Sequence, residues 1–416
     1  MADARRVIAD LRELAQRTST RDGAQRVAWG PTWRAARAWF AEEVGKLGLD
    51  VETDAAGNRW VTLPGASDRV VVVGSHIDSV PNGGWLDGCL GVVTALELLR
   101  DHAASRPAAT LVAVDWADEE GARFGRSLFG SAAACGTLDL ADVRTLRDRQ
   151  GTALVDALRE NGVELERVLD AHARLVALAP RAYLELHIEQ GPVLESLGRS
   201  TAVVLGTVGV ERHRIRFCGQ AAHSGSTPIP MRRDAFLAAA EAALRFRDIA
   251  VAHSRPGGGV VCTVGVVEVE PRIVTAVPGV CEISLDQRAL DAGVLARIHQ
   301  EAREAVASAA RRNDVTVEWT PLLRIDPRPF DPRLLALCEA AVLAETGHAP
   351  TLPSGPLHDA SEMARIVPTV MMFASSARGL SHCKEEDTPE PHLEEALRAF
   401  FRLVDGAMAE VAGTGD

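Results

Sequence analysis

Two short apolar runs constrain the fold of this chain most. Val70–Val73 and Leu111–Val114 are rich in β-branched residues, and polar or glycine-rich sequence follows each of them. Such continuous runs are typical of central strands that helices cover on both faces. The segment Leu90–Leu99 between them has the apolar spacing of a helix. The order strand, helix, strand predicts an α/β sheet.

The pattern changes between about residues 208 and 320. There, strand-like segments alternate with two long helical ones at 233–247 and 292–311, which predicts an α+β region with one β-rich layer and two helices. After it the chain returns to the first pattern, with an apolar strand at 369–373. A length of 416 residues also exceeds what one compact core usually holds.

We therefore predict an α/β catalytic domain, a mixed sheet flanked by helices, that is made of two separated segments. These segments are residues 1–207 and 325–416. Residues 208–324 would form an inserted α+β domain between them.

The composition excludes several classes of function. Lys and Arg number 45 against 57 Asp and Glu, a net charge of -12, which argues against a nucleic acid or an anionic membrane as partner. No apolar run approaches the roughly 18 residues of a membrane span. The seven cysteines are widely spaced without a C-x-x-C pair, which indicates free thiols rather than a disulfide framework. Since the N-terminus also lacks a signal-peptide core, we expect a cytoplasmic protein.

The strongest chemical signal directly follows the first apolar run, in GSHIDSVPNGGWLDGCLG (74–91). His76 stands at the strand end, where open α/β sheets place their ligand sites. Asp78 lies two residues on, and Asp87 lies in a glycine-rich loop. Metal-bound histidines usually give their other ring N–H to a carboxylate, and the spacing of His76 and Asp78 suits that arrangement. The spacing alone is also compatible with a histidine and two aspartates in a solvated loop, and the further Asp in the glycine-rich loop makes a metal site the stronger candidate.

The second apolar run is followed by DWADEEGARFG (115–125). The adjacent carboxylates of Glu119 and Glu120 would repel each other unless a positive group lies beside them. A metal ion satisfies that need, with one Glu as ligand and the other free to hold a proton from water.

Two further histidines lie in ELHIEQG and GLSH, at His187 and His382. Together with His76, Asp87 and one of the two adjacent glutamates they offer three imidazoles and two carboxylates. That donor set suits borderline ions such as Zn, Mn, Co or Ni, and not Ca or Mg. A nucleophile elbow, a P-loop and a G-x-G-x-x-G after the first strand are all missing from the sequence.

Several motifs occur in order over about residues 25 to 410: GSHIDSVPNGGWLDG, ADEEGARF, LELHIEQGP, QAAHSGSTP, AVPG, DQR, LHDA and GLSH. The chain resembles the hydantoinase/carbamoylase branch of the M20 metallo-amidohydrolases. These include N-carbamoyl-L-amino-acid hydrolases, allantoate amidohydrolases and β-ureidopropionases. The resemblance implies a di-metal aminopeptidase-like catalytic domain with an inserted lid and dimerisation domain. It further implies a homodimer.

The resemblance also implies a metal site with two divalent ions per subunit, zinc first and manganese, cobalt or nickel as alternatives. His76 and His187 would bind one ion, Glu120 and His382 the other, and Asp87 would bridge them. By the same resemblance, Asp78 would orient His76, and Glu119 would be the general base.

The remaining roles concern the substrate. By resemblance, His358 would stabilise the oxyanion, and His223 would reach the site of the partner subunit. The substrate would be contacted by Gln190, Arg288, Thr275 and Gly355, with Arg288 clamping its carboxylate. From the residues alone, Arg288 could instead form a structural ion pair, His223 could cap a turn, and His358 could pack against Asp359.

The implied reaction is hydrolysis of the ureido C–N bond of an N-carbamoyl-L-amino acid through a metal-bridging water, giving amino acid, CO2 and ammonia. Allantoate or β-ureidopropionate hydrolysis, N-acyl-amino-acid or dipeptide hydrolysis and a non-catalytic binding role are the alternatives. Three segments depart from the family pattern: Thr275 stands near an expected Asn, Pro356 and Leu357 replace small residues, and CKEEDTPE follows His382. Leu357 and the lost amide predict a pocket that prefers apolar side chains.

Overall fold

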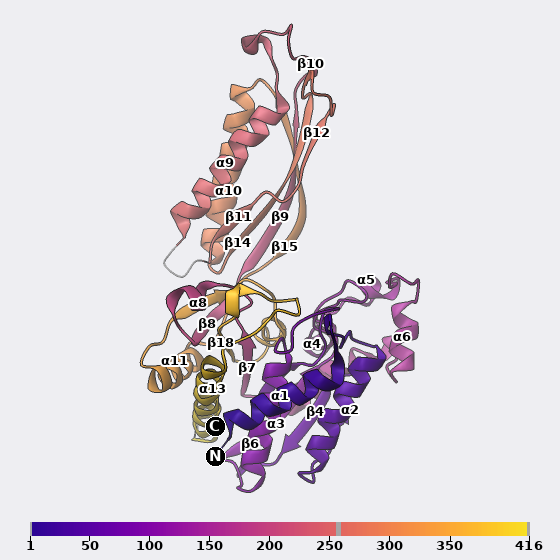
Figure 1. Ribbon diagram of the computed structural model, residues 1–416, viewed down its shortest axis with the longest axis vertical. Coiled ribbons are helices and arrows are strands. Elements are labelled where there is room, and N and C mark those ends of the chain that lie inside the picture. Colours follow the sequence, from indigo (N-terminus) through magenta and orange to yellow (C-terminus); the bar gives the residue numbers. More distant parts are fainter. Residues whose placement is uncertain (1, 255–258, 414–416) are drawn as a thin grey trace. The chain divides into compact units, whose positions relative to one another are not determined.

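The computed structural model describes residues 2–254 and 259–413, and Figure 1 traces the chain. The chain forms two compact units. Unit 1 comprises Met1–Leu205, Phe330–Thr351 and Leu357–Asp416, and unit 2 comprises Gly206–Pro329 and Leu352–Pro356. The short return of the chain at 352–356 is a feature that the sequence did not indicate.

Unit 1 is a mixed α/β structure. Its helices are α1 (Ala4–Thr18), α2 (Pro31–Gly45), α3 (Cys89–Ala103), α4 (Phe129–Cys135), α5 (Leu140–Arg144), α6 (Leu154–Glu160), α7 (Asp170–Leu178), α8 (Val193–Leu197), α11 (Pro332–Thr346), α12 (Asp359–Met363) and α13 (Glu390–Gly413), with short 3-10 turns at Leu165–Arg167 and Ala377–Gly379. Its strands are β1 (Ser19–Thr20), β2 (Gly23–Ala24), β3 (Glu52–Thr53), β4 (Arg59–Leu63), β5 (Ser67–His76), β6 (Ala109–Trp116), β7 (Ala182–Ile188), β8 (Thr201–Thr207) and β18 (Thr369–Ala374), and β17 (Thr351–Ser354) begins at its border.

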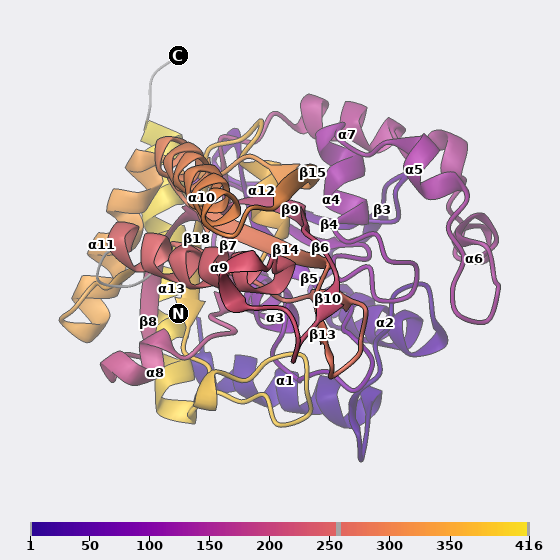
Figure 2. The same ribbon diagram turned by 90° about the horizontal axis from the view of Figure 1, so that it is seen from above.

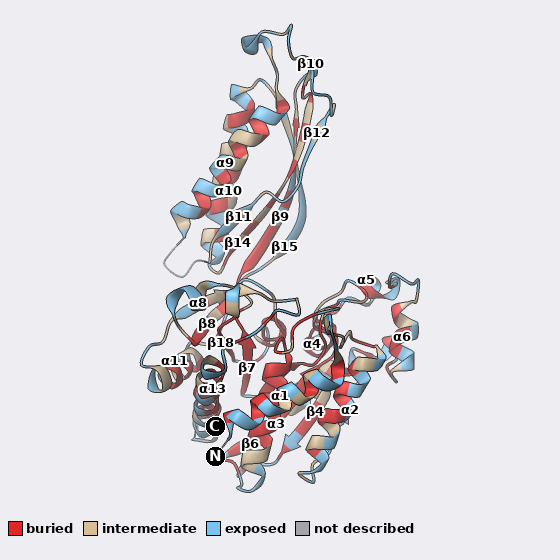
Figure 3. Cartoon of the chain, viewed as in Figure 1, coloured by how far each residue is buried: buried red, intermediate tan, exposed pale blue. Residues whose placement is uncertain are grey.

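The central sheet of unit 1 carries the order β8-β18-β7-β5-β6-β4-β3. The four inner strands β18, β7, β5 and β6 run parallel, whereas β8, β4 and β3 pair antiparallel. Every residue of β6, β7 and β18 is buried, as the red strands in Figure 3 indicate. The prediction of a mixed sheet with buried apolar strands is confirmed, and the carboxyl ends of four parallel strands meet at one edge.

Helices on this sheet explain its burial. α3 and α13 pack against β5, β6 and β7, and α1 packs on both of these helices. α12 packs on β7 and β18 and contacts α4. α2 begins with Pro31 in its first turn, where proline fits a helix, and it ends at Gly45.

Unit 2 is an α+β structure. Its strands are β9 (Gly209–Cys218), β10 (Ala222–His223), β11 (Val261–Thr263), β12 (Val267–Glu270), β13 (Ala276–Val277), β14 (Val280–Ala289), β15 (Thr316–Ile325) and β16 (Arg328–Pro329), and its helices are α9 (Ala235–His253) and α10 (Ala292–Arg312), with a 3-10 turn at Ile229–Met231. Five strands form an antiparallel sheet in the order β11-β14-β9-β15, with β12 also on β14. α9 and α10 lie side by side in Figure 2 and pack against each other.

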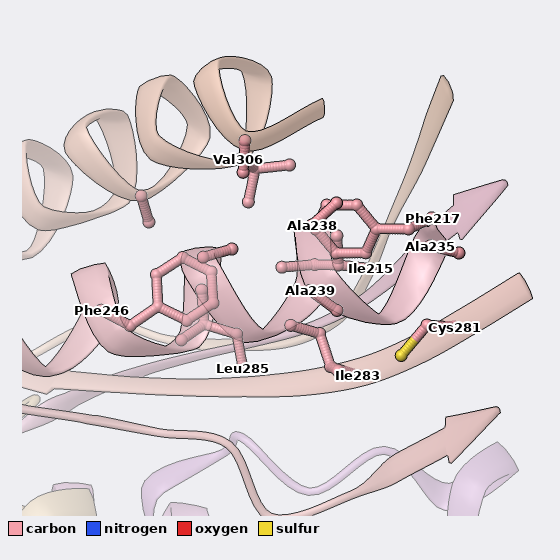
Figure 4. Packing of buried hydrophobic residues seen from close by; sticks show 13 residues of the cluster. Ile215, Phe217, Ala235, Ala238, Ala239, Phe246, Cys281, Ile283, Leu285 and Val306 are labelled. Atoms are coloured by element: carbon pink, nitrogen blue, oxygen red, sulfur yellow. The ribbon is translucent and has the colours of Figure 1, made fainter. Parts of the chain in front are cut away.

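The core of unit 2 lies between this sheet and the two helices. Strand β14 alternates strictly between buried and partly exposed residues, which is the pattern of a sheet covered on one face. Figure 4 shows Ile215 and Phe217 of the sheet beside Ala238 of α9, and Leu285 of β14 beside Phe246 of α9, with Val306 of α10 above them.

One predicted strand of unit 2 is divided. The sequence 259–270 reads as a continuous strand, but the structure splits it into β11 and β12, which pair with successive stretches of β14. The hydroxyl of Ser284 accepts hydrogen bonds from the N–H groups of Gly265 and Val266 at 3.1 and 3.0 Å. These bonds engage the backbone between the two strands, where residues 264–266 lie outside strand structure. Within the described part of the chain, every helix is too short or too polar to cross a membrane.

Candidate active site

The predicted metal ligands gather at the carboxyl edge of the parallel strands in unit 1. His76 is the last residue of β5, and His187 lies near the end of β7. Glu120 follows the end of β6, and His382 follows β18. Because these four strands are neighbours, residues that are far apart in sequence share one site.

Asp87 lies between two groups of candidate ligands. Its Oδ1 is 3.2 Å from Nε2 of His187, and its Oδ2 is 3.3 Å from Nε2 of His382. Nε2 of His382 is also 3.5 Å from Oε2 of Glu120. The ligand atoms of His76, Asp87 and His187 lie within 4.8 Å of one another, and so do those of Asp87, Glu120 and His382. A carboxylate that gives one oxygen to each group has the arrangement of a bridging ligand.

Backbone carbonyls orient the two buried histidines. Nδ1 of His76 lies 3.1 Å from the carbonyl of Asp78, and Nδ1 of His187 lies 2.9 Å from the carbonyl of Ile188. A proton on each Nδ1 satisfies these contacts and leaves Nε2 as the ligand atom.

The carboxylate of Asp78 holds the adjacent loop. Its Oδ1 accepts the N–H of Glu119 at 3.2 Å, and its Oδ2 accepts the N–H of Glu120 at 3.1 Å. The distance from Oδ1 to Nδ1 of His76 is 3.6 Å. The carboxylate therefore fixes the two glutamates directly, while the carbonyl of the same residue makes the closer contact to His76.

The site concentrates buried carboxylates. Burial raises the pKa of Glu119 well above its usual range, and burial together with Asp87 raises the pKa of Glu120 to about 7. Burial would lower the pKa of His76, but the negative charges of Glu119 and Asp78 raise it well above its usual value. Buried charges of this kind are stable only when they are paired or coordinate a metal. The oxygen and imidazole donors fit a borderline divalent ion.

A second ring of side chains contacts Asp87. Nε2 of Gln190 donates to Oδ2 of Asp87 at 3.1 Å and to Ser381 at 3.2 Å. Among the described residues, Oε1 of Gln190 is buried without a hydrogen-bond partner. The carboxylate of Glu386 accepts the N–H of Asp87 at 3.0 Å and the hydroxyl of Ser381 at 2.8 Å. Sequence reasoning missed Glu386, although it lies in the segment CKEEDTPE that departs from the family pattern.

His358 lies beside His187, with ring centroids 4.4 Å apart. Burial, reinforced by the positive His187, lowers its pKa well below the usual value, so its imidazole is neutral at pH 7. Ligand atoms of Glu185, His187 and His358 lie within 4.8 Å of one another, and Glu185 accepts hydrogen bonds from Ser75, from Tyr183 and from the N–H of Ala360 at 2.7, 3.0 and 3.0 Å. Because both of its oxygens are engaged, Glu185 supports the site and is not a free ligand.

The other predicted substrate residues lie in unit 2. His223 is exposed, and its Nδ1 accepts the N–H groups of Gly225 and Ser226, both at 3.2 Å, which is the turn-capping arrangement. Thr275 is exposed as well, and its carbonyl accepts the N–H of Ser224 at 2.9 Å.

Arg288 makes an ion pair within unit 2. Its Nε donates to Oδ1 of Asp286 at 2.8 Å, and its Nη1 donates to the carbonyl of Gly355 at 3.2 Å. Both Arg288 and Gly355 line a hollow of about 520 Å³ on the face of the sheet away from the helices. The guanidinium borders an open space, although its charge is already paired.

The site at the strand ends, where two groups of imidazoles and carboxylates share Asp87, has the donor set of a metal-dependent hydrolase. Residues 72–406 match the family described as Peptidase family M20/M25/M40, and the chain belongs to this family, which is metal-dependent. The chain is 34% identical over 387 residues to an N-carbamoyl-L-amino acid amidohydrolase of Geobacillus stearothermophilus, with 91% of each chain covered.

Two further comparisons point the same way. An allantoate amidohydrolase of Escherichia coli K12 is 33% identical, with 92% of each chain covered. A crystal structure of a hydantoinase/carbamoylase family amidase from Burkholderia multivorans superposes with a TM-score of 0.86 at 29% identity, covering 100% of this chain and 99% of the other. The predicted family is thus confirmed, and the protein is a hydrolase of the amidohydrolase type.

Proposed function

We propose that the protein hydrolyses the ureido C–N bond of an N-carbamoyl-L-amino acid to the free amino acid, CO2 and ammonia. The observation that carries this proposal is the position of Asp87 between two ligand groups, with Glu119 beside one of them. Relatives named for N-carbamoyl-L-amino acids and for allantoate support a ureido substrate.

Five residues would hold the metal. His76 and His187 would bind one divalent ion, Glu120 and His382 would bind the other, and Asp87 would bind both. Zinc is our first choice, with manganese, cobalt or nickel as alternatives. When bound, such ions lower the pKa of water and polarise a carbonyl group.

Glu119 would serve as the general base. Its Oε2 lies 3.7 Å from Nε2 of His76, and the side chain is buried at the edge of the ligand groups. Its raised pKa suits a carboxylate that takes a proton from the attacking water and delivers it to the leaving nitrogen. Asp78 would position this base, since it holds the N–H of Glu119.

Neutral His358 would donate a hydrogen bond to the oxyanion that forms at the ureido carbon. The unpartnered Oε1 of Gln190 would accept from an N–H of the ureido group. Arg288 would bind the substrate carboxylate with its planar guanidinium, and Gly355 and Thr275 would complete the substrate contacts.

A homodimer formed through unit 2 is part of the proposal. His223 is exposed there and would serve the site of a second copy. Unit 2 also exposes an apolar hollow of about 400 Å³ on α9 and β12, where Phe236, Leu244 and Val267 are 42%, 58% and 53% exposed. Exposed apolar surface of this kind is typical of interaction sites. Leu244→Glu should give monomers in analytical ultracentrifugation, and a monomer with full activity would contradict the role of His223.

The substrate test uses metal-stripped protein reconstituted with Zn, Mn, Co or Ni in turn. Ammonia and free amino acid are measured with N-carbamoyl-L- and D-amino acids, allantoate, β-ureidopropionate and N-acetyl-amino acids. We expect metal-dependent ammonia release from N-carbamoyl-L-amino acids, with higher kcat/KM for leucine and methionine derivatives than for glycine. If ammonia is released only from allantoate or only from β-ureidopropionate, that compound is the substrate in place of an N-carbamoyl-L-amino acid. Amino acid without ammonia would make the protein an acylase or peptidase, and silence across the panel would refute the proposal.

A further inference from the structure

A second group of metal-ligating side chains lies in unit 2, within its own core and outside the site described above. It consists of Glu211 and His213 on β9 and His299 on α10, whose ligand atoms lie within 4.8 Å of one another. We propose that this group binds one divalent transition-metal ion that links the sheet of unit 2 to helix α10.

The local structure explains why the three side chains meet. Glu211 and His213 are two residues apart on a strand, so both point to the face that the helices cover, and both are buried. His299 follows Ile298, whose side chain is fully buried in the contact between α10 and the sheet. The helix thus carries an imidazole to the border of the packed face, where it is 25% exposed.

The separations suit a shared ion better than hydrogen bonds. Oε2 of Glu211 lies 3.3 Å from Nδ1 of His299 and 3.5 Å from Nε2 of His213. Among the described residues, neither ring nitrogen of His213 has a hydrogen-bond partner, and Nδ1 of His299 has none. His213 is only 6% exposed, and unsatisfied polar atoms at such depth are rare in native proteins. An ion between the rings would accept lone pairs from both imidazoles.

Burial and the nearby positive side chains outweigh the negative charge of Glu211 and favour neutral histidines, which are the form that binds metal. Burial lowers the pKa of His213, and the neighbouring His299 lowers it further. Burial also lowers the pKa of His299, with Arg303 and Arg324 acting in the same direction. Nη1 of Arg324 lies 3.4 Å from Oε1 of Glu211, which leaves Oε2 for the ion.

The neighbouring strand offers a fourth candidate metal ligand, the side-chain amide oxygen of Gln287. Gln287 pairs directly with Glu211 across β9 and β14, and it is fully buried on the same face. Its Oε1 has no hydrogen-bond partner within the described residues. Two imidazoles, a carboxylate and an amide oxygen select Zn, Co or Ni over Mg or Ca. The positive charge of Arg324 repels a cation at this group, so removing the Arg324 side chain should tighten the binding of the metal ion.

The binding test uses the full chain carrying Asp87→Asn, which removes the ligand shared by both groups of the active site. Bound Zn²⁺ is measured by equilibrium dialysis and elemental analysis, with and without a second substitution. His299→Gln or His213→Gln should lower the bound metal by about one equivalent. The matched control is His253→Gln, because His253 on α9 pairs with Glu301 on α10 at 2.9 Å and no third metal-ligating side chain joins this pair among the described residues. Equal metal in all four proteins would overturn the proposal.

Two further measurements guard against misfolding of the histidine variants. Arg324→Gln keeps all the proposed ligands and should lower the Kd for Zn²⁺, whereas an unchanged or higher Kd would count against the site. Trp319 lies with its ring centroid 5.1 Å from that of His213 and 5.5 Å from that of His299, and it is the only tryptophan in the sequence of unit 2. Co²⁺ should therefore quench a fluorescence component that Trp319→Phe removes. Quenching that persists in Trp319→Phe to the same extent would refute binding at this group.

Discussion

Glu386 offers the sharpest test of how the active site is held together. Glu386 is 1% exposed, and its carboxylate accepts hydrogen bonds from the N–H groups of Leu86 and Asp87 at 3.2 and 3.0 Å. The loop packs directly on it, because a Cβ added at Gly84 would lie 1.9 Å from Oε1 of Glu386. Through Ser381 the same carboxylate reaches the segment that carries His382. One side chain thus connects the loops of two proposed ligands.

Glu386→Ala should release both loops. Each hydrogen bond to a charged acceptor is worth roughly 1.5–3 kcal/mol, so the loss of the two bonds from the N–H groups of Leu86 and Asp87 costs the loop that carries Asp87 about 3–6 kcal/mol. Loss of a residue that orients metal ligands typically lowers metal affinity by about 10–100-fold, or about 1.4–2.7 kcal/mol. The part of the lost hydrogen-bond energy that does not lower metal affinity should appear as faster hydrogen exchange of the backbone amides of Leu86 and Asp87.

The assay combines Zn²⁺ competition against a chelator of known affinity with hydrogen exchange of the peptide that contains Asp87. Glu386→Gln keeps an oxygen that can accept both N–H groups, so it should recover most of the affinity. Glu385→Ala is the matched control, since the side chain of Glu385 is exposed and its closest charged contact is Lys384 at 4.0 Å. Wild-type metal affinity together with wild-type exchange in Glu386→Ala would refute the reasoning.

Two predictions concern Arg288 and its partner. Arg288→Lys loses the planar two-point contact to a carboxylate, so KM should rise by about 10–100-fold with a smaller change in kcat, whereas Arg214→Lys on the exposed face of β9 should change neither. A KM unchanged in Arg288→Lys would remove Arg288 from the substrate contacts. Burial would raise the pKa of Asp286, but hydrogen bonds from Arg288 and Arg212 outweigh it and lower the pKa. The ion pair therefore stabilises the protein above the unfolded-state pKa of about 3.9 and is lost as the pH falls through the lowered value. The Tm difference between wild type and Asp286→Asn should be constant near neutral pH and shrink below about pH 4; a difference that grows in acid would contradict this.

The sequence predicted the parts of the fold and of the site that depend on local pattern. Val70–Val73 and Leu111–Val114 are central strands because continuous apolar runs need cover on both faces. The residues that follow these strands meet because parallel neighbours end at one edge. The proximity of His76 and Glu119 could therefore be predicted without the structure.

The remaining features depend on loop geometry and on packing across long sequence separations. Glu386 acts through the N–H groups of a loop 300 residues away, which no spacing in its own segment indicates. Glu211 and His299 lie on a strand and a helix that read as ordinary elements, and only their packing brings the two side chains together. The division of residues 259–270 into two strands depends on the hydroxyl of Ser284, which belongs to another strand.

The proposed division of labour between Glu119 and Glu120 can be tested in one experiment. Metal content and turnover of an N-carbamoyl-L-amino acid are measured side by side for wild type, Glu119→Gln and Glu120→Gln. If Glu119 moves the proton and Glu120 binds metal, Glu119→Gln should keep its metal and lose about 10²–10⁴-fold in kcat, whereas Glu120→Gln should lose bound metal. Wild-type turnover in Glu119→Gln, with metal still bound, would contradict the account.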